Sequence, residues 1–179
     1  MRLPRRLSEA RFAGRPPVRA DARAKLAQAQ SELALALAGQ GPLPAGFDRA
    51  RIAAAADALL RKRARAVAAS WPALAQSLGE SFNARFARYA QASSIPLKGG
   101  PLADGRLFAR MLEQAGEFPG EARLEKLAFD ARYAPARDGH VPRSGLSIRA
   151  AIFKRPLRLV IVVRHSRFGE RWLNYKAAV

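Results

Sequence analysis

The sequence predicts an α+β protein that is mainly α, with an N-terminal bundle of about five or six helices followed by a small C-terminal antiparallel sheet. Apolar residues recur at helical spacing between positions 21 and 133, and they alternate with polar residues after position 145. Between these regions lie the linker residues Pro135, Gly139, Pro142 and Gly145. We therefore expect a flexible basic arm (1–20), a helical bundle domain (21–133) and a basic linker and β region (134–179).

The chain is strongly basic, because 32 Lys and Arg face 14 Asp and Glu, a formal net charge of +18. Residues 132–179 hold eleven Lys and Arg against two acidic residues, a local balance of 11 − 2 = +9. Such a charge favours anionic partners, namely nucleic acid, an acidic peptide or an acidic protein face. Arginine (26) far outnumbers lysine (6), a bias that a GC-rich genome also produces. Composition therefore leaves open whether the arginines are functional.

Several site classes are excluded or disfavoured by composition. The absence of cysteine excludes disulfides and cysteine chemistry, and it fits a reducing cytoplasm. Two histidines leave little material for a metal site. The longest apolar run, residues 157–163, is too short to span a membrane. The arm has no apolar run of signal-peptide length. We expect a soluble, cytoplasmic protein without a cofactor.

The first helices follow from cap and periodicity signals. A leucine spacing predicts a helix over 21–38, and Asp48 suits the cap of the next one. This second helix carries a cluster of cations, which we place in its last turns, where cations complement the helix dipole. The cluster is a candidate anion-binding site made of Arg61, Lys62, Arg63 and Arg65.

A sharp corner is predicted where the second helix meets Trp71 and Pro72. Proline lacks a backbone donor and suits the first residue of a helix, so Pro72 is expected to open the next helix, with Ser70 or Trp71 at its cap. Helical spacing then predicts that aromatic residues pack in the core; they are Phe82, Phe86 and Tyr89.

Two more helices are expected before the linker. Asp104 is placed at the cap of a helix that ends near Gly116. A Phe-Pro-Gly corner opens another helix, whose inward residues are Leu124, Leu127, Ala128 and Ala131 and whose outward residues are Glu121, Arg123, Glu125 and Lys126.

Alternation predicts three strands at the C-terminal end. One face of the first holds Leu146, Ile148, Ala150 and Ile152, and one face of the second holds Leu157, Leu159, Ile161 and Val163. The third strand contains Trp172, Leu173 and Tyr175, reached through the turn HSRFGE.

Four segments together resemble a known family: KRARAVAASWPALAQSLGESF, PLADGRLFARML, FPGEARLEKLAFD and PLPAGF. Their order and spacing, over roughly residues 34–133, are similar to the helical domain of a bacterial family labelled DNA-binding. Its members often work with multinuclear non-haem iron dependent oxidative enzymes that modify ribosomally made peptides. The family typically has Phe-Pro where this chain has Trp71-Pro72, and a second mixed domain where this chain has a short basic strand region.

The resemblance implies an accessory protein that binds the iron enzyme and presents its precursor peptide without doing chemistry itself. From the residues, we expect arginines beside an exposed strand edge to hold an extended acidic peptide by strand addition. The candidate peptide- or partner-binding residues are Arg149, Arg158, Arg164, Arg167, Arg171 and Trp172. A competing interpretation is that these arginines protect the edge against aggregation.

Nucleic-acid binding is the alternative function. It would use the basic arm, the cation cluster of the second helix, and the strand region with Phe168 and Trp172 as stacking surfaces. Catalysis is disfavoured, because Asp138, His140 and Ser144 come with no nucleophile motif. We therefore predict that the protein is not an enzyme.

Overall fold

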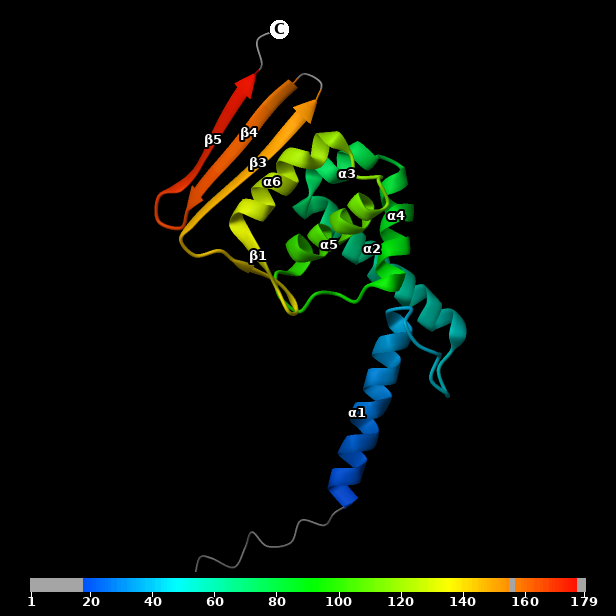
Figure 1. The fold of residues 1–179 in the computed structure, drawn as a ribbon. Coiled ribbons are helices and arrows are strands. Elements are labelled where there is room, and N and C mark those ends of the chain that lie inside the picture. Colours follow the sequence, from blue (N-terminus) through cyan, green and yellow to red (C-terminus); the bar gives the residue numbers. More distant parts are fainter. Residues whose placement is uncertain (1–17, 155–156, 177–179) are drawn as a thin grey trace, which may run out of the picture. The chain divides into compact units, whose positions relative to one another are not determined.

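A computed structural model describes residues 18–154 and 157–176, and it confirms the predicted fold class (Figure 1). Six α-helices precede a two-stranded and a three-stranded antiparallel sheet among these residues. The chain separates into two compact units, residues 1–56 and residues 57–179. The predicted basic arm lies almost entirely outside the described residues. Among the described helices, none combines the length and the apolar character needed to cross a membrane.

The first unit contains helix α1 (Val18–Leu37) and the beginning of α2 (Arg49–Ser70). The predicted cap of α2 is confirmed, because the Asp48 carboxylate accepts hydrogen bonds from the backbone N–H groups of Ala50 (2.8 Å) and Arg51 (3.1 Å). These two bonds satisfy two of the free donors at the helix start.

The corner between α2 and α3 (Pro72–Leu78) is also confirmed, with Pro72 opening α3 and Trp71 at the N-cap position. The Trp71 ring is 1% exposed, and its Nε1 donates to the Leu102 carbonyl at 2.9 Å. A Cβ on Gly105 would lie 2.1 Å from the Trp71 ring, so only glycine allows this close approach. The corner is thus held by packing against α5 (Gly100–Gln114).

A carboxylate from a helix distant in sequence caps the N-terminus of α3. Trp71 makes no side-chain cap bond; instead, the N–H groups of Ala73 and Leu74 donate to Glu125 at 3.1 and 2.9 Å. Glu125 belongs to α6 (Arg123–Arg132), which follows the 3-10 turn Gly120–Ala122. The predicted outward role of Glu125 is therefore wrong, because the free N–H groups and positive dipole end of α3 attract its carboxylate.

The core of the second unit is rich in aromatic rings, as the spacing predicted. Phe86 and Tyr89 come from α4 (Ser81–Ala92), and the Phe108 ring of α5 meets them with centroids 5.3 and 5.5 Å away. Phe86, Phe108 and Trp71 are each at most 1% exposed.

Two helix ends differ from the prediction. α2 runs on to Ser70, so its last turn has no basic residue, because the alanine-rich sequence keeps the helix going until Pro72 stops it. α5 begins at Gly100 rather than after Asp104, because Pro101 suits its first turn. Asp104 is consequently inside the helix and only 2% exposed.

The β region contains one hairpin where a linker was predicted. β1 (Tyr133–Ala136) pairs with β2 (Gly139–Pro142), and an isolated bridge ties Gly139 to Lys98. The prolines and Gly139 hid this hairpin, since such residues usually mark loops.

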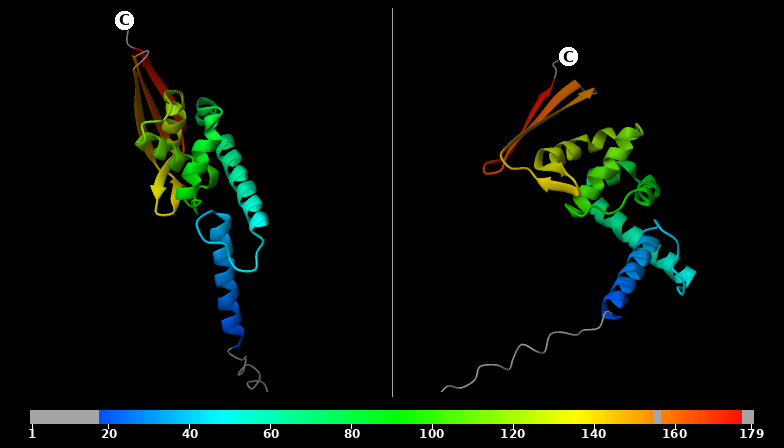
Figure 2. Two further views of the ribbon diagram at one scale, coloured as in Figure 1. Left: turned by 90° about the vertical axis from the view of Figure 1, so that its right-hand side faces the viewer. Right: turned by 60° about the horizontal axis from the view of Figure 1, so that its bottom comes forward.

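The three predicted strands are confirmed as β3 (Leu146–Lys154), β4 (Leu157–His165) and β5 (Gly169–Lys176), in the order β3-β4-β5. Figures 1 and 2 show the helices of the second unit on one side of this sheet. We call that side the inner face; there Leu127 and Ala131 of α6 pack against Val160 and Val162. Leu146, Ile148 and Ile152 of β3 share a face as predicted, but this is the opposite, outer face.

Candidate functional site

Arg63, a member of the predicted cation cluster, is engaged inside the helical core. Its Nε and Nη2 each donate to the Asp104 carboxylate at 2.8 Å, and its Nη1 donates to the Ser93 carbonyl at 3.0 Å. The Tyr89 hydroxyl donates to Asp104 at 2.7 Å, and the guanidinium lies 5.6 Å from the Phe86 ring centroid. The hydrogen-bonding capacity of Arg63 is thus used within the protein rather than offered to a bound anion.

This network shifts the protonation of its members. Burial and the hydrogen bond to Asp104 raise the pKa of Tyr89 well above its ordinary value. Burial alone would lower the pKa of Arg63, but hydrogen bonding and the charge of Asp104 raise it overall. The tyrosine therefore stays a neutral donor and the arginine a cation, as the network requires.

The other three members of the cluster have a different setting. Arg61, Lys62 and Arg65 are exposed, and none has an ion-pair partner within the described part of the chain. The candidate anion-binding cluster on α2 is thus reduced to these three residues.

The predicted strand arginines do not form one surface. Arg158 and Arg164 lie on β4, the central strand, whose two edges are both paired, and they share the inner face with Val160 and Val162. The Arg158 guanidinium lies 4.4 Å from the Phe153 ring centroid. Arg164 donates to the Arg143 carbonyl at 3.3 Å. The sequence could predict that Arg158 and Arg164 share one face of a strand, but it could not predict that this strand is the central one.

β5 and its turn hold three further predicted residues. Arg167 is exposed in the turn before β5, and Arg171 follows on the outer face. Trp172 lies on the inner side, where its Nε1 donates to Glu170 at 2.7 Å. Glu170 also accepts two hydrogen bonds from Arg132 of α6, at 2.9 and 3.1 Å. Burial opposes ionisation of Glu170, but these donors hold its pKa below the ordinary value.

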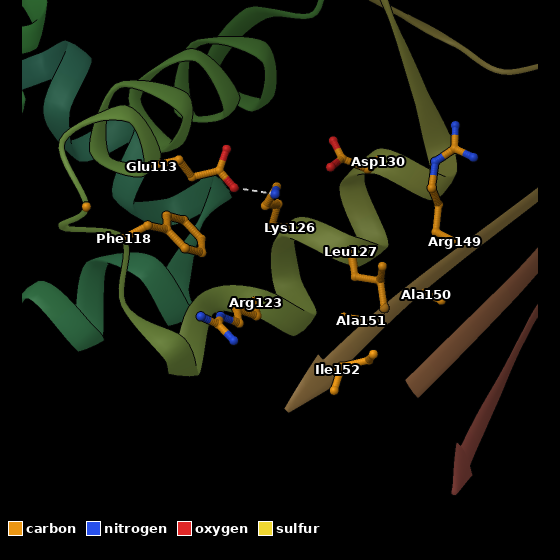
Figure 3. A pocket seen from close by; sticks show the side chains of 11 residues that line it. Glu113, Phe118, Arg123, Lys126, Leu127, Asp130, Arg149, Ala150, Ala151 and Ile152 are labelled. Carbon is orange, nitrogen blue, oxygen red and sulfur yellow. Dashed lines mark ion pairs between the residues drawn. The ribbon is translucent and has the colours of Figure 1, made fainter. Parts of the chain in front are cut away.

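Arg149 is the predicted residue that lies at a strand edge. β3 has β4 on one side and no strand on its other side among the described residues. Along that free edge runs a cavity of about 520 Å³, which we call the β3-edge groove (Figure 3). Its walls are formed by β3, α6 and the end of α5, with the lining residues Glu113, Gly116, Phe118, Arg123, Lys126, Leu127, Asp130, Arg149, Ala150, Ala151 and Ile152.

The groove has an excess of unpaired positive charge. Lys126 pairs with Glu113, and Asp130 pairs with Arg106 at 2.8 Å. Within the described ranges, Arg123 and Arg149 have no carboxylate within ion-pair distance. Both carboxylates of the groove are therefore neutralised, and two guanidinium groups are left beside an open strand edge.

Sequence reasoning missed Arg123 and Lys126 as site residues, because it placed them only among the outward residues of the last helix. A signal was present: Arg123, Lys126 and Asp130 recur at i, i+3 and i+7, and so share one helix face. That this face borders a strand edge depends on tertiary packing between α6 and β3, which local spacing does not encode.

A second cavity, of about 650 Å³, shares Glu113 and Asp130 with the groove and extends to the β1–β2 hairpin. His140 lines it, and burial together with the charge of Arg106 lowers the pKa of this histidine. No cluster of three or more His, Asp or Glu residues suited to a metal ion occurs in residues 18–154 and 157–176.

Comparison with known proteins finds similarity over about half of the chain. Residues 27–114 match the family described as "SCO6045-like, C-terminal domain". A curated relative, a UPF0276 protein of Streptomyces avermitilis, is 41% identical over 89 residues. This match covers 50% of the present chain and 18% of the relative, so most of the relative has no counterpart here. No solved structure matches the chain significantly.

Proposed function

We propose that the chain is a non-catalytic accessory protein that captures an acidic precursor peptide and presents it to a multinuclear iron enzyme of ribosomal-peptide maturation. The observation that carries this proposal is the β3-edge groove, where a free strand edge lies beside Arg123 and Arg149. An extended peptide in the groove would add a strand to β3, and its carboxylates would pair with the two guanidinium groups.

The comparisons support the enzyme partner in this proposal. We take the UPF0276 relative to be an iron enzyme of the kind that the sequence resemblance named. The Streptomyces avermitilis relative contains, within one long polypeptide, a segment 41% identical to half of this chain. A domain that is covalently joined to an enzyme in one protein is a natural candidate for a separate partner of such an enzyme in another.

The geometry of Glu125 and His140 disfavours one catalytic arrangement, a triad built on His140. Glu125 is engaged as the cap of α3, and Nδ1 of His140 is buried without a hydrogen-bond partner in the described part of the chain. Asp138 therefore does not orient His140 in the way a catalytic triad requires.

Peptide capture is tested by fluorescence anisotropy with a labelled ten-residue peptide in which Glu alternates with Val and Thr. Arg149→Glu and Arg123→Glu should each weaken binding at least fivefold, because each reverses a charge at the groove. Arg167→Glu is the matched control, since it changes the net charge equally in the turn before β5. An equal loss in the control would show that binding follows net charge and would remove the groove from the proposal.

Strand addition has its own test. A peptide of the same sequence with alternate backbone nitrogens methylated keeps its charge but loses main-chain donors on one edge. Two such peptides, methylated in opposite registers, should differ in affinity, because only one register faces β3. Equal affinities for both methylated peptides and the parent peptide would exclude strand pairing.

The enzyme partner is tested by purifying tagged protein from cells that also express a UPF0276 enzyme with its precursor peptide, followed by iron analysis. A stoichiometric iron-containing complex is expected. A metal-free protein that elutes alone would count against the accessory role.

Nucleic-acid binding is the second candidate, favoured by Arg61, Lys62 and Arg65 on α2, which are exposed and have no ion-pair partner among the residues that the structure describes. Phosphate contacts by these residues would give an affinity for DNA that falls steeply with salt. Replacing all three by Gln should reduce that salt slope. If DNA binds tightly while acidic peptides do not bind, this second function replaces the first.

A further inference from the structure

The outer face of the three-stranded sheet is apolar and uncovered within the second unit. Its exposed large residues are Leu146, Ile148, Ile152, Leu157, Leu173 and Tyr175, each between 43% and 62% exposed. No other described element of residues 57–176 packs on this face, since all the helices of the unit lie on the inner side (Figure 2). Exposed contiguous apolar surfaces are characteristic of interaction sites.

The register places these side chains in rows across the sheet. Ile152, Leu159 and Tyr175 are neighbours, and so are Ala150, Ile161 and Leu173. The inner face of the same strands carries Ser147, Arg149, Arg158 and Arg164 instead. In this sheet the more apolar side is therefore the one left open, which is the reverse of the pattern expected for a sheet in contact with solvent on one side.

We propose that the outer face is the interface of a symmetric dimer, in which a second copy of this chain packs its outer face on the first. Two sheets packed in this way form a sandwich with about 10 Å between them. Such an interface is isologous, so the same rows of side chains meet from both copies.

The area is sufficient for a weak, specific dimer. Three strands about 4.8 Å apart, with eight or nine residues rising about 3.3 Å each, give a flat face of roughly 400 Å². Corrugated side chains expose more than the flat area, so two faces together reach the order of 1,000 Å² that specific interfaces require. Interfaces at this lower end of the size range are typically transient, so we expect a weak dimer.

The charge distribution also fits a second copy. Although each chain has a net charge of +18, the middle of the outer face carries no charged residue. Lys154 and Arg171 lie towards opposite ends of the face, six residues apart in register and so separated by about 20 Å, which exceeds the Debye length of about 8 Å at physiological salt. The outer face is thus a surface on which two strongly basic molecules can meet without bringing cations together at its centre.

Dimerisation covers the outer face but not α6, which forms the inner wall of the β3-edge groove; Ala150 and Ile152, which also line the groove, belong to the outer face. The inference is independent of the proposed function. A dimer would nevertheless present two grooves at once, which raises the apparent affinity for any partner that offers two binding segments.

Sedimentation velocity of the full chain tests the proposal at concentrations from about 1 to 100 μM. The mass should rise from 19.5 kDa to twice that value. Raising NaCl from about 0.15 to 0.5 M should tighten the dimer, because salt screens repulsion between the basic copies without weakening apolar burial. A mass of one chain throughout would overturn the proposal.

The interface is located by the double variant Ile148→Thr/Leu173→Thr, which removes apolar surface from β3 and β5 while keeping residues that suit strands. Its dissociation constant should rise at least tenfold. Leu97→Thr is the matched control, because Leu97 is also apolar and exposed but lies before α5. Unchanged dimerisation of the double variant, with circular dichroism like that of the wild type, would overturn the assignment to the outer face. The proposal would also be overturned if the wild-type protein were a monomer and the substitutions in its outer face abolished binding of the iron enzyme.

Discussion

The pair of Arg63 and Asp104 offers a direct test of how the core is held. Replacing Asp104 by Leu removes the acceptor of two guanidinium bonds and of the Tyr89 hydroxyl, and it leaves a cation whose side chain is 13% exposed. Breaking a buried ion pair in this way costs about 3–5 kcal/mol. Since small domains are stable by only about 5–15 kcal/mol, this is a large share of the free energy of unfolding.

The double variant Arg63→Met/Asp104→Leu sharpens the prediction. With both charges gone, the side chains repack as apolar groups, so the double variant should be more stable than Asp104→Leu alone by about 2 kcal/mol or more. Urea unfolding followed by tryptophan fluorescence measures these differences. Arg61→Met and Arg65→Met, exposed on the same helix, are the matched controls and should change stability by less than about 0.5 kcal/mol.

A small effect would refute this reasoning. If Arg63→Met costs less than about 1 kcal/mol and instead weakens the binding of an anion such as DNA, then Arg63 reaches solvent and belongs with its exposed neighbours.

Three further predictions concern the same core. Trp71→Ala should cost about 3–5 kcal/mol in urea unfolding, because the ring is buried and hydrogen-bonded; a cost under about 1 kcal/mol would show an exposed ring. Glu125→Ala should cost about 1–2 kcal/mol by leaving two N–H groups of α3 unpaired, and an unchanged stability would mean that water replaces the carboxylate. Tyr89 should make stability fall above about pH 10, because its raised folded pKa lets the native state hold a proton that the unfolded state releases. The free energy of unfolding of Tyr89→Phe should then depend less steeply on pH between about 9 and 11, and equal slopes would contradict the shift.

The helical bundle was predictable where one local signal decides the backbone. A proline ends a helix in almost any sequence context, as Pro72 ends α2. The Asp48 carboxylate caps the start of α2 without any tertiary partner. Reliance on a local signal also explains why Asp104 was wrongly predicted to be a helix cap. It has the residue type of a cap, yet its carboxylate binds Arg63, a residue 41 positions away.

The sheet shows a different limit of sequence reasoning. Alternation correctly grouped Leu146, Ile148 and Ile152 on one face, because side chains point to opposite sides along any strand. Alternation cannot say which face meets a helix. In this protein α6 covers the face with Val160 and Val162, so Leu146, Ile148 and Ile152 lie on the exposed outer face rather than in the core.

The candidate site was predictable only in part for related reasons. Arg149 was named from its strand position, and it lines the groove. Arg158 and Arg164 had equal claims in the sequence, but strand order placed them in the middle of the sheet. Charge reversal at these two positions would therefore test the packing of the inner face more than the capture of a peptide.

The carboxylate of Glu125 has a consequence for how this protein can be divided. The similarity to the SCO6045-like family ends at residue 114, before α6 begins. A fragment cut there would keep Trp71 and α3 but lose Glu125 and Phe129, whose ring lies 5.2 Å from that of Trp71. The end of the family match at residue 114 is therefore not a boundary between independently folding parts of this chain, because α6 contributes contacts to the corner between α2 and α3.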